Sequence, residues 1–471
     1  MTTARSERPG VGLLVILLLS FGLKLSVLFA AGDIRPVKDE RNYLYAAQSI
    51  SNGNGIAYAM EHWDEFHAPP FYPYFLGLVF YLGGGSFEAK IVQVILSTIT
   101  VWLLYLIGKR WFDARAGLWG AAIAAFYPTL IAFTHYNWVE TSFLLWFYCA
   151  ILLLFDRAGG LHTRKHFLAA GILLGVASMC RAEVVYALPL MVVWIFTATR
   201  QLSEAAQKGA LLVLGCVATL LPWNLHIYRE LGGFLPITSA SSDVWYLSYN
   251  AFEPGNQDFG ISANEFRKPY RSQARAMVES DDIVDRLRQE KALAFQFMAE
   301  NPLLCARRFF TRVVLLLNPT SFLIRHVRKD FYKQNRRTYF RSFPGAAKEA
   351  VVLMTVASYM LMSVLALIGL VTMPAGRPRS LILLLLTYFV AIYGLTYAMS
   401  RYRLSFVPLL MLAAGYAIAN WRDCLARLRS PKRAVSAAVG LILLCIVWSV
   451  HFDRLWHVPA ERPTQIPALK K

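Results

Sequence analysis

The most regular pattern in the sequence is an alternation of long apolar runs with short polar connections. The first run, Val11–Ala31, follows Arg5 and Arg8 and is longer than the core of an ordinary signal peptide, so we expect an uncleaved first membrane helix. Further runs that can cross a bilayer are Ala89–Gly108, Ala116–Phe133, Thr141–Phe155, Phe167–Cys180, Val184–Thr199, Ala210–His226, Glu349–Thr372, Leu381–Ala398, Leu404–Asn420 and Val435–His451. The pattern predicts an all-α polytopic membrane protein with roughly eleven transmembrane helices.

The polar connections predict the orientation of these helices. With a cytoplasmic N-terminus, the connections rich in Lys and Arg lie on the cytoplasmic side: "KRWFDAR", "DRAGGLHTRKH", "RQLSEAAQK", "AGRPRS" and "WRDCLARLRSPKR". Two large loops, 32–88 and 227–348, then lie outside. We therefore expect an N-terminal membrane module (1–226, including the first loop), an external helical subdomain (227–348) and C-terminal membrane helices (349–471).

One segment complicates this topology. Phe309–Ile324 is apolar enough to be a span, and a very basic stretch, "RHVRKDFYKQNRRTYFR", follows it. A crossing here would reverse every later helix and place "WRDCLARLRSPKR" outside. We prefer a surface-lying or re-entrant segment, because long loops are translocated largely regardless of their charge.

Composition supports the membrane assignment and excludes several functions. Of 471 residues, 56% are hydrophobic and only 16% are charged, which is too apolar for a set of soluble domains. The net charge of +19 comes mainly from the short connections, so it indicates membrane topology and contact with membrane lipids instead of nucleic acid. The six cysteines show no paired spacing, so we expect no disulfide framework. No cluster of metal ligands stands out in the sequence, and we expect no metal and no cofactor.

The first external loop begins with an acidic pair close to the bilayer, in the stretch "RPVKDERNYLY". Tyr43, Ala46 and Ile50 follow at helical spacing, which predicts a short helix along the membrane with Asp39 or Glu40 in its first turn. Such a carboxylate is either a helix cap or a catalytic group.

Other charged residues fall at the same predicted membrane depth. Glu140 lies in "HYNWVETSFLLW", Arg181 and Glu183 in "CRAEVVYALP", and Arg401 and Arg403 in "YAMSRYRLSFVP". Each alone is explained by capping or by snorkelling at a helix end. Together, acidic and guanidinium groups at one depth suit a substrate with an anionic phosphate and a hydroxyl that loses its proton.

The order of these motifs resembles the GT-C fold of glycosyltransferases that use lipid-linked sugars. The resemblance is to bacterial members similar to protein O-mannosyltransferases and to the lipid A aminoarabinose transferase, and it spans most of the chain. Its landmarks are "DERNYLY", "APPFYPYFLG", "YPTLIAFTHYNWVETSFLLW", "CRAEVVYALP", "LPWNLHIYRELGGFLPITSASSDVWYLSYN" and "SRYRLSFVPLL".

The resemblance implies an inverting transfer of a sugar from a polyprenyl-phosphate donor to a lipid, glycan or protein acceptor. Asp39 matches the family's general base, Glu40 would orient the helix or the acceptor, and Glu140 matches a second acidic position. The residues implied to bind the donor phosphate are Arg401, Arg403, Arg181 and His67; His67 stands where the aminoarabinose transferases have a lysine. The aromatic residues implied to line the substrate cavity are Tyr43, Tyr72 and Trp245. The resemblance also implies a bacterial inner membrane, with the active site on the external face.

Rival functions remain open at this point. A transporter or flippase for lipid-linked sugars would share the apolar, basic character, but it would usually show matching repeats and polar residues at mid-membrane, which the sequence lacks. A polysaccharide polymerase or ligase would differ in architecture, and a scaffold would leave the grouping of Asp39, Glu140 and Arg401 unexplained. The motifs do not specify the sugar, the acceptor or the polyprenol length, because cavity shape sets all three.

Overall fold

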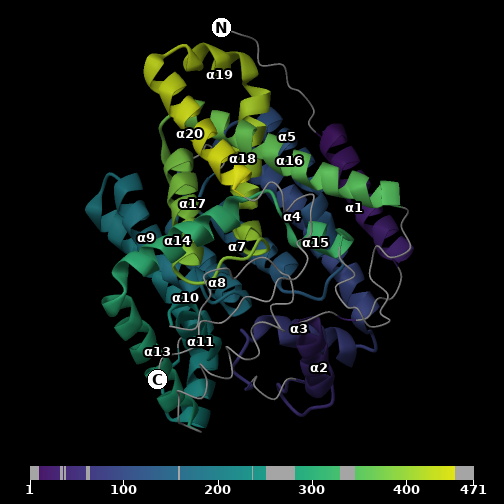
Figure 1. Ribbon diagram of the computed structural model, residues 1–471, viewed down its shortest axis with the longest axis vertical. Helices are drawn as coiled ribbons and strands as arrows, with labels where there is room; N and C mark the ends of the chain where they lie inside the picture. The colour runs from purple at the N-terminus through teal and green to yellow at the C-terminus, as the bar shows by residue number, and fades with distance from the viewer. Residues whose placement is uncertain are drawn as a thin grey trace, which may run out of the picture.

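The computed structural model describes residues 10–31, 36, 39–59, 64–156, 160–235, 237–250, 282–328 and 345–450 (Figure 1). The helices of the N-terminal half are α1 (Gly10–Ala31), α2 (Asp39–Ser51), α3 (Phe71–Tyr81), α4 (Ser86–Trp111), α5 (Ala114–Phe126), α6 (Pro128–Phe133), α7 (Glu140–Leu153), α8 (Arg164–Cys180), α9 (Val184–Ala198) and α10 (Leu202–Leu231). Those that follow are α11 (Ala240–Ser248), α13 (Ile283–Glu300), α14 (Pro302–Leu317), α15 (Phe322–Arg328), α16 (Gly345–Thr372), α17 (Arg377–Leu395), the 3₁₀ helix η1 (Tyr402–Ser405), α18 (Val407–Ala419), α19 (Trp421–Leu428) and α20 (Pro431–Ser449). Throughout the described ranges, the predicted all-α architecture is confirmed.

Six of the described helices are long and apolar enough to cross a membrane: α1, α4, α10, α16, α17 and α20. By length and composition, the chain is therefore a multi-pass membrane protein. Shorter apolar helices, α5, α7, α9 and α18, occupy other predicted crossings. The predicted count of eleven crossings is not confirmed by these helices.

The predicted span Ala116–Phe133 is wrong as one continuous helix. It is divided into α5 and α6 at Tyr127, whose extended backbone (φ −72°, ψ 114°) precedes Pro128 at the start of α6. Proline disfavours helical backbone in the residue before it and cannot donate a main-chain hydrogen bond, so the helix ends there.

The predicted cytoplasmic connections meet at one end of the molecule. Asn420 donates a side-chain hydrogen bond to Asp113 at 3.3 Å, and Arg377 donates one to the main-chain oxygen of Ala198 at 2.8 Å. Helix α19 lies at this end, whereas α2, α3, α11 and α13 lie at the opposite end (Figure 1). The alternation of loops between two ends follows the pattern predicted from their charges.

Helix α14 covers part of the ambiguous segment and packs against α17 and α20. Arg308 donates to the main-chain oxygen of Asn250 at 3.1 Å, and Arg312 donates to that of Leu395 at 3.3 Å. These arginines face inward on an amphipathic helix that is not among the six long apolar ones. The placement of this segment on the surface or as a re-entrant piece stays a prediction. Most of the basic stretch that follows, residues 329–344, lies outside the described part of the chain.

Small residues bring the helices of the bundle into close contact. A Cβ atom added to Gly171 on α8 would lie 2.2 Å from the main-chain oxygen of Leu212 on α10. A Cβ added to Gly215 on α10 would lie 2.4 Å from the main-chain oxygen of Leu168. Such backbone contact is how membrane helices gain packing energy without a hydrophobic driving force.

The two large loops that the sequence predicts to be external pack against each other. Asp64, in the first loop, accepts a hydrogen bond from the Ser239 hydroxyl at 2.8 Å and forms an ion pair with Arg286 of α13 at 3.2 Å. The main-chain N–H of Ser239 also donates to Phe66 at 2.9 Å. Helix α13 matches the amphipathic helix predicted before Pro302. These contacts join both loops into one layer over the end that carries α2.

Candidate active site

The predicted helix of the first loop exists, and both acidic residues stand in its first turn. Its Asp39 carboxylate lies 2.9 Å from Nη1 of Arg401, 362 residues later in the chain. Both side chains are partly exposed, Asp39 at 27% and Arg401 at 17%. Burial lowers the pKa of Arg401, but the charge of Asp39, together with Glu140, outweighs burial and raises the pKa well above its ordinary value. Arg401 is thus a permanent cation at the start of η1.

Glu140 opens helix α7 and lies between two guanidinium groups. Its Oε1 atom is 3.7 Å from Nη1 of Arg181 and 3.9 Å from Nε of Arg401. Both distances are short enough for an ion pair but too long for a hydrogen bond. Oε2 of Glu140, Nη1 of Arg181 and Nε of Arg401 are buried without a hydrogen-bond partner. Buried polar atoms are normally satisfied, so these three atoms mark a place where a ligand can complete the network.

Aromatic rings hold both arginines in place. The Arg401 guanidinium lies 5.1 Å from the ring centre of Trp138 and 5.4 Å from that of Tyr402. The Arg181 guanidinium lies 4.8 Å from the ring centre of the same Tyr402 and 5.5 Å from that of Phe143. Cations gain roughly 0.5–2 kcal/mol from such contacts, depending on their desolvation. Tyr402 therefore contacts both cations of the cluster.

A short segment, residues 134–139, connects α6 to Glu140 and is pinned to three other elements; we call it the connecting strap. The main-chain N–H of Asn137 donates to Oε1 of Glu40 at 2.7 Å. The Gln93 amide on α4 donates to the Tyr136 oxygen at 2.9 Å, and a ring nitrogen of His135 contacts the Lys24 oxygen of α1 at 2.9 Å. Glu40 thus links the first turn of α2 to the segment that leads into Glu140.

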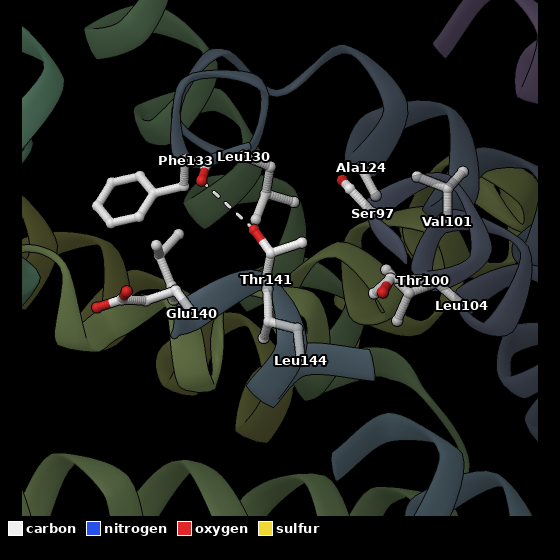
Figure 2. A pocket seen from close by; sticks show the side chains of 11 residues that line it. Ser97, Thr100, Val101, Leu104, Ala124, Leu130, Phe133, Glu140, Thr141 and Leu144 are labelled. Atoms are coloured by element: carbon white, nitrogen blue, oxygen red, sulfur yellow. Dashed lines mark hydrogen bonds between the residues drawn. The ribbon is translucent and has the colours of Figure 1, made fainter. Parts of the chain in front are cut away.

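A small cavity lies beside Glu140 (Figure 2). Its volume is about 10 Å³, which is roughly the space that one water molecule needs. Thr141 lies in the middle of the view, with the Glu140 carboxylate on one side and Ser97 and Thr100 on the other (Figure 2). The cavity is too small for a sugar, so it is a local gap behind Glu140 and is not the substrate site.

The structure does not bring Arg403 to this cluster. Its guanidinium is buried, donates to the main-chain oxygens of Asn318 and Thr320, and lies 4.2 Å from the ring centre of Tyr359. His67 accepts a hydrogen bond on its main-chain oxygen from Thr238, in the layer formed by the external loops. Neither contact includes a member of the acidic cluster.

The three predicted cavity aromatics occupy different surroundings. Tyr43 is partly buried one turn after Asp39, and burial together with the Asp39 charge raises its pKa well above the ordinary value. Tyr72 is fully buried, packs edge-on against Tyr43 at 5.1 Å and donates to Gln93 at 3.1 Å. Trp245 stacks on Tyr249 and on Phe295 of α13, each at 6.0 Å, and none of its described contacts reaches Asp39.

Several aromatic members of the cluster are not predicted from the sequence. Trp138 and Tyr402 contact Arg401, while Tyr393 contacts Arg181 and donates a hydrogen bond to Glu183. The positions of Trp138 and Tyr402 close to Glu140 and Arg401 in the motifs are the available signal, and Tyr393 has none. Within the described residues, no group of three or more His, Cys, Asp or Glu side chains is placed to hold a metal ion.

The structure is a bundle of apolar helices, with a charged cluster at one end, of the kind that multi-pass membrane proteins have. Residues 67–223 match the family described as dolichyl-phosphate-mannose-protein mannosyltransferase. The family resemblance predicted from the motifs is therefore confirmed. The matched stretch includes Glu140 and Arg181. It does not include Asp39 or Arg401, and the ion pairs of the structure place these two residues in the site.

Two solved proteins and one curated relative add to this picture. The chain is 24% identical over 201 residues to an undecaprenyl phosphate-alpha-4-amino-4-deoxy-L-arabinose arabinosyl transferase of Pseudomonas savastanoi pv. phaseolicola, a match covering 41% of this chain and 38% of the relative. The archaeal oligosaccharyltransferase AglB of Archaeoglobus fulgidus, solved with an inhibitory peptide and a dolichol-phosphate, aligns with 96% of this chain and 56% of its own at 14% identity and a TM-score of 0.50. ArnT of Cupriavidus metallidurans, bound to undecaprenyl phosphate, aligns with 88% of this chain and 78% of its own at 15% identity and a TM-score of 0.42. The family match and the curated relative both fall in one class, glycosyltransferases that use polyprenyl-phosphate-linked sugars.

Proposed function

We propose that this protein is a membrane glycosyltransferase that moves a sugar from a polyprenyl-phosphate donor to an acceptor hydroxyl or phosphate. The observation that carries the proposal is the meeting of Asp39, Glu140, Arg181 and Arg401 at one end of the helix bundle. A carboxylate that can accept a proton thus lies beside guanidinium groups that can bind a phosphate. The family match and the curated relative support the same class of donor.

In the proposed reaction Asp39 is the general base. It takes the proton of the acceptor hydroxyl as the acceptor oxygen attacks the anomeric carbon. A new bond forms between that carbon and the acceptor oxygen, and the bond to the phosphate oxygen breaks with its electron pair on the phosphate. Attack opposite the leaving group inverts the anomeric configuration. A phosphate acceptor would need no deprotonation, so the role of Asp39 as a base applies to a hydroxyl acceptor.

Arg401 links the two halves of this reaction. Without substrate, its Nη1 atom pairs with Asp39 at 2.9 Å, while its Nε atom has no hydrogen-bond partner. A donor phosphate would compete with Asp39 for the guanidinium, because both are anions that match its donor geometry. Donor binding would then loosen the Asp39 carboxylate and make it available to the acceptor. Arg181, with a free Nη1 position facing Glu140, would assist with the phosphate charge as it develops.

Glu140 would keep the guanidinium groups of Arg181 and Arg401 close to each other. Its carboxylate lies between Arg181 and Arg401 and is only 4% exposed. Two guanidinium groups close together repel each other, and one carboxylate between them offsets that repulsion. Phosphate binding by Arg403 and His67 has less support, because the contacts of Arg403 are with main-chain oxygens and those of His67 lie in the loop layer.

We further propose that the cluster faces the outside of a bacterial inner membrane. The basic connections gather at the end opposite to Asp39, which the positive-inside rule assigns to the cytoplasm. In this arrangement α5, α7, α8, α9 and α18 would join the six long helices as crossings and give the predicted eleven.

The proposal is tested by following labelled sugar from total polyprenyl-phosphate sugars into membrane acceptors. Wild type is compared with Asp39→Asn at matched expression. The control is Asp285→Asn, which neutralises an exposed first-turn carboxylate of α13. Loss of transfer in Asp39→Asn alone is expected, and equal transfer in all three proteins would refute Asp39 as the base. Movement of the lipid across the membrane without transfer by wild type would refute the enzyme and favour a flippase.

A further inference from the structure

A chain of polar side chains runs from Glu140 away from the proposed substrate groups into the bundle. Nε of Arg181 donates to Oε1 of Glu183 at 2.7 Å. The Tyr393 hydroxyl of α17 donates to the same carboxylate oxygen at 2.8 Å and also contacts the Ser405 hydroxyl at 2.8 Å. Ser405 belongs to η1, the helix that begins just after Arg401. The chain therefore returns to the cluster from behind.

We infer that Glu183 is a positioning residue for the transfer reaction, which aims Arg181 at Glu140 and sets the charge balance of the cluster. This inference rests on the proposed function. Glu183 lies behind Arg181, and the described contacts of its carboxylate are with Arg181 and Tyr393. It would act through Arg181 and need not touch the substrate.

The geometry restricts Arg181 to one orientation. Its Nε edge is bonded to Glu183, and its face lies against Tyr402 and Phe143. The Nη1 atom is then directed to Glu140, at 3.7 Å and without a hydrogen bond. Rotation of the guanidinium would break the Glu183 contact and the ring contacts together. Glu183 thus preserves an unused donor at the place where a phosphate or sugar oxygen can bind.

Charge gives Glu183 a second effect on the reaction. The cluster of Asp39, Glu140, Glu183, Arg181 and Arg401 contains three carboxylates and two guanidinium groups. Burial raises the pKa of Glu183, but the Arg181 charge and the hydrogen bonds from Tyr393 and Arg181 hold it below its ordinary value. Glu183 is therefore ionised at neutral pH. Its negative charge opposes the loss of a proton from nearby carboxyl groups.

The groups that face these carboxylates come from several helices. Glu183 is faced by Arg181, by Tyr186 of α9, and by Tyr388 and Tyr393 of α17. The charged and titratable neighbours of Asp39 and Glu140 are Arg401, Arg181, Tyr43 and Tyr72. Tyr43 keeps its proton near neutral pH because burial raises its pKa. Between pH 5 and 8, Glu183 is then a fixed charge whose removal should change the titration of the other carboxylates.

Helix α17 offers a matched pair of variants. The Tyr393 hydroxyl contacts the Glu183 carboxylate, whereas the Tyr388 hydroxyl donates to the main-chain oxygen of the same residue. Tyr393→Phe and Tyr388→Phe each remove one hydroxyl from one helix near one residue. Tyr393→Phe removes a hydrogen bond to the Glu183 carboxylate, whereas Tyr388→Phe removes one to the Glu183 main-chain oxygen.

The test is the pH dependence of the initial transfer rate, measured for wild type, Glu183→Gln, Glu183→Asp, Tyr393→Phe and Tyr388→Phe. We expect Glu183→Gln to lower kcat about tenfold or more, since a 1 Å misplacement in a site can cost about 100-fold. Its acid limb should move to lower pH, because removing a negative charge favours ionisation of Asp39 and Glu140. Glu183→Asp should restore the wild-type acid limb, Tyr393→Phe should shift it in the same direction as Glu183→Gln by a smaller amount, and Tyr388→Phe should leave it unchanged.

The outcomes separate the inference from the function on which it rests. Absence of transfer by wild type would overturn the proposed function itself. Wild-type transfer with the same acid limb in Glu183→Gln and Tyr393→Phe would overturn the inference alone. Equal shifts in Tyr393→Phe and Tyr388→Phe would also overturn it, because they would report a general loosening of α17. If Glu183→Gln does not fold, as judged by size exclusion in detergent, Glu183→Asp and the tyrosine pair still decide.

Discussion

Arg401 and Arg403 stand two residues apart in the chain, yet their guanidinium groups have different kinds of partner. Arg401 pairs with the Asp39 carboxylate, whereas Arg403 donates to the main-chain oxygens of Asn318 and Thr320. Tyr402, between them, contacts Arg401 and Arg181. One motif thus supplies a cation for the cluster and another that holds the segment after α14. The two arginines should consequently fail in different ways when they are replaced.

Replacing Arg401 should affect transfer more than stability. Arg401→Gln removes the cation that faces Asp39 and the donor phosphate, and we expect a rate loss of about 100-fold or more. Arg401→Lys keeps the charge but loses the forked donor geometry, so an intermediate rate is expected. The measurement is the initial rate at saturating donor for protein of equal folded amount. A rate for Arg401→Gln within threefold of wild type would contradict this role.

Replacing Arg403 should affect stability more than transfer. Arg403→Met keeps the length and the contact with Tyr359, but it leaves two buried main-chain oxygens without their charged donor. The expected loss is about 3 kcal/mol in the free energy of unfolding. A lower melting temperature in detergent, with an unchanged KM for the donor in the folded fraction, is the result to look for. A raised KM at an unchanged melting temperature would instead return Arg403 to the phosphate site.

Glu40 should prove important for its contact with Asn137. Glu40→Ala leaves the buried Asn137 N–H without this acceptor, at a cost of about 1–3 kcal/mol, and lets the connecting strap shift. Glu40→Gln retains an acceptor oxygen and should lose less. Melting temperature and transfer rate are measured together for both variants. If Glu40→Gln loses transfer completely while its melting temperature stays at the wild-type value, the charge of Glu40 has a direct chemical role.

The contact between α8 and α10 gives a prediction about folding alone. Gly171→Ala places a methyl group 2.2 Å from the Leu212 oxygen, so the two helices must separate. We expect a clear fall in the yield of folded protein and in its melting temperature, because tightly packed interiors relax poorly around added atoms. Gly22→Ala on α1 is the control, since no atom lies within 4 Å of its added Cβ. Equal behaviour of the two variants would show that the helix contact is looser than described.

Helical spacing and the positions of prolines predict individual helices of the fold. The spacing after Glu40 predicts α2 with both carboxylates in its first turn, and the amphipathic stretch before Pro302 predicts α13; both are found. The division of Ala116–Phe133 is not predicted, because the apolar run is long enough for one span and contains only a single proline. Proline at the start of α6 decides that boundary.

The members of the charged cluster were predicted better than their partners. Asp39, Glu140, Arg181 and Arg401 were expected at one membrane depth, and the structure brings their side chains together. The separate location of Arg403 depends on the carbonyl groups of residues 318 and 320, which pattern alone does not place beside it. Glu183 was visible in its motif, but its link to Tyr393 requires the packing of α17 against the turn before α9.

The pairing of Asp39 with Arg401 has a consequence for how the protein is made. The two residues lie 362 positions apart, and chains grow at about 5–20 residues per second, so Arg401 is synthesised roughly 20–70 s after Asp39. During that interval the first carboxylate is already at the membrane surface while its partner does not yet exist. A chain released before residue 401 is added would lack one of the two guanidinium groups of the cluster. Activity is therefore expected to switch on only when synthesis is nearly finished.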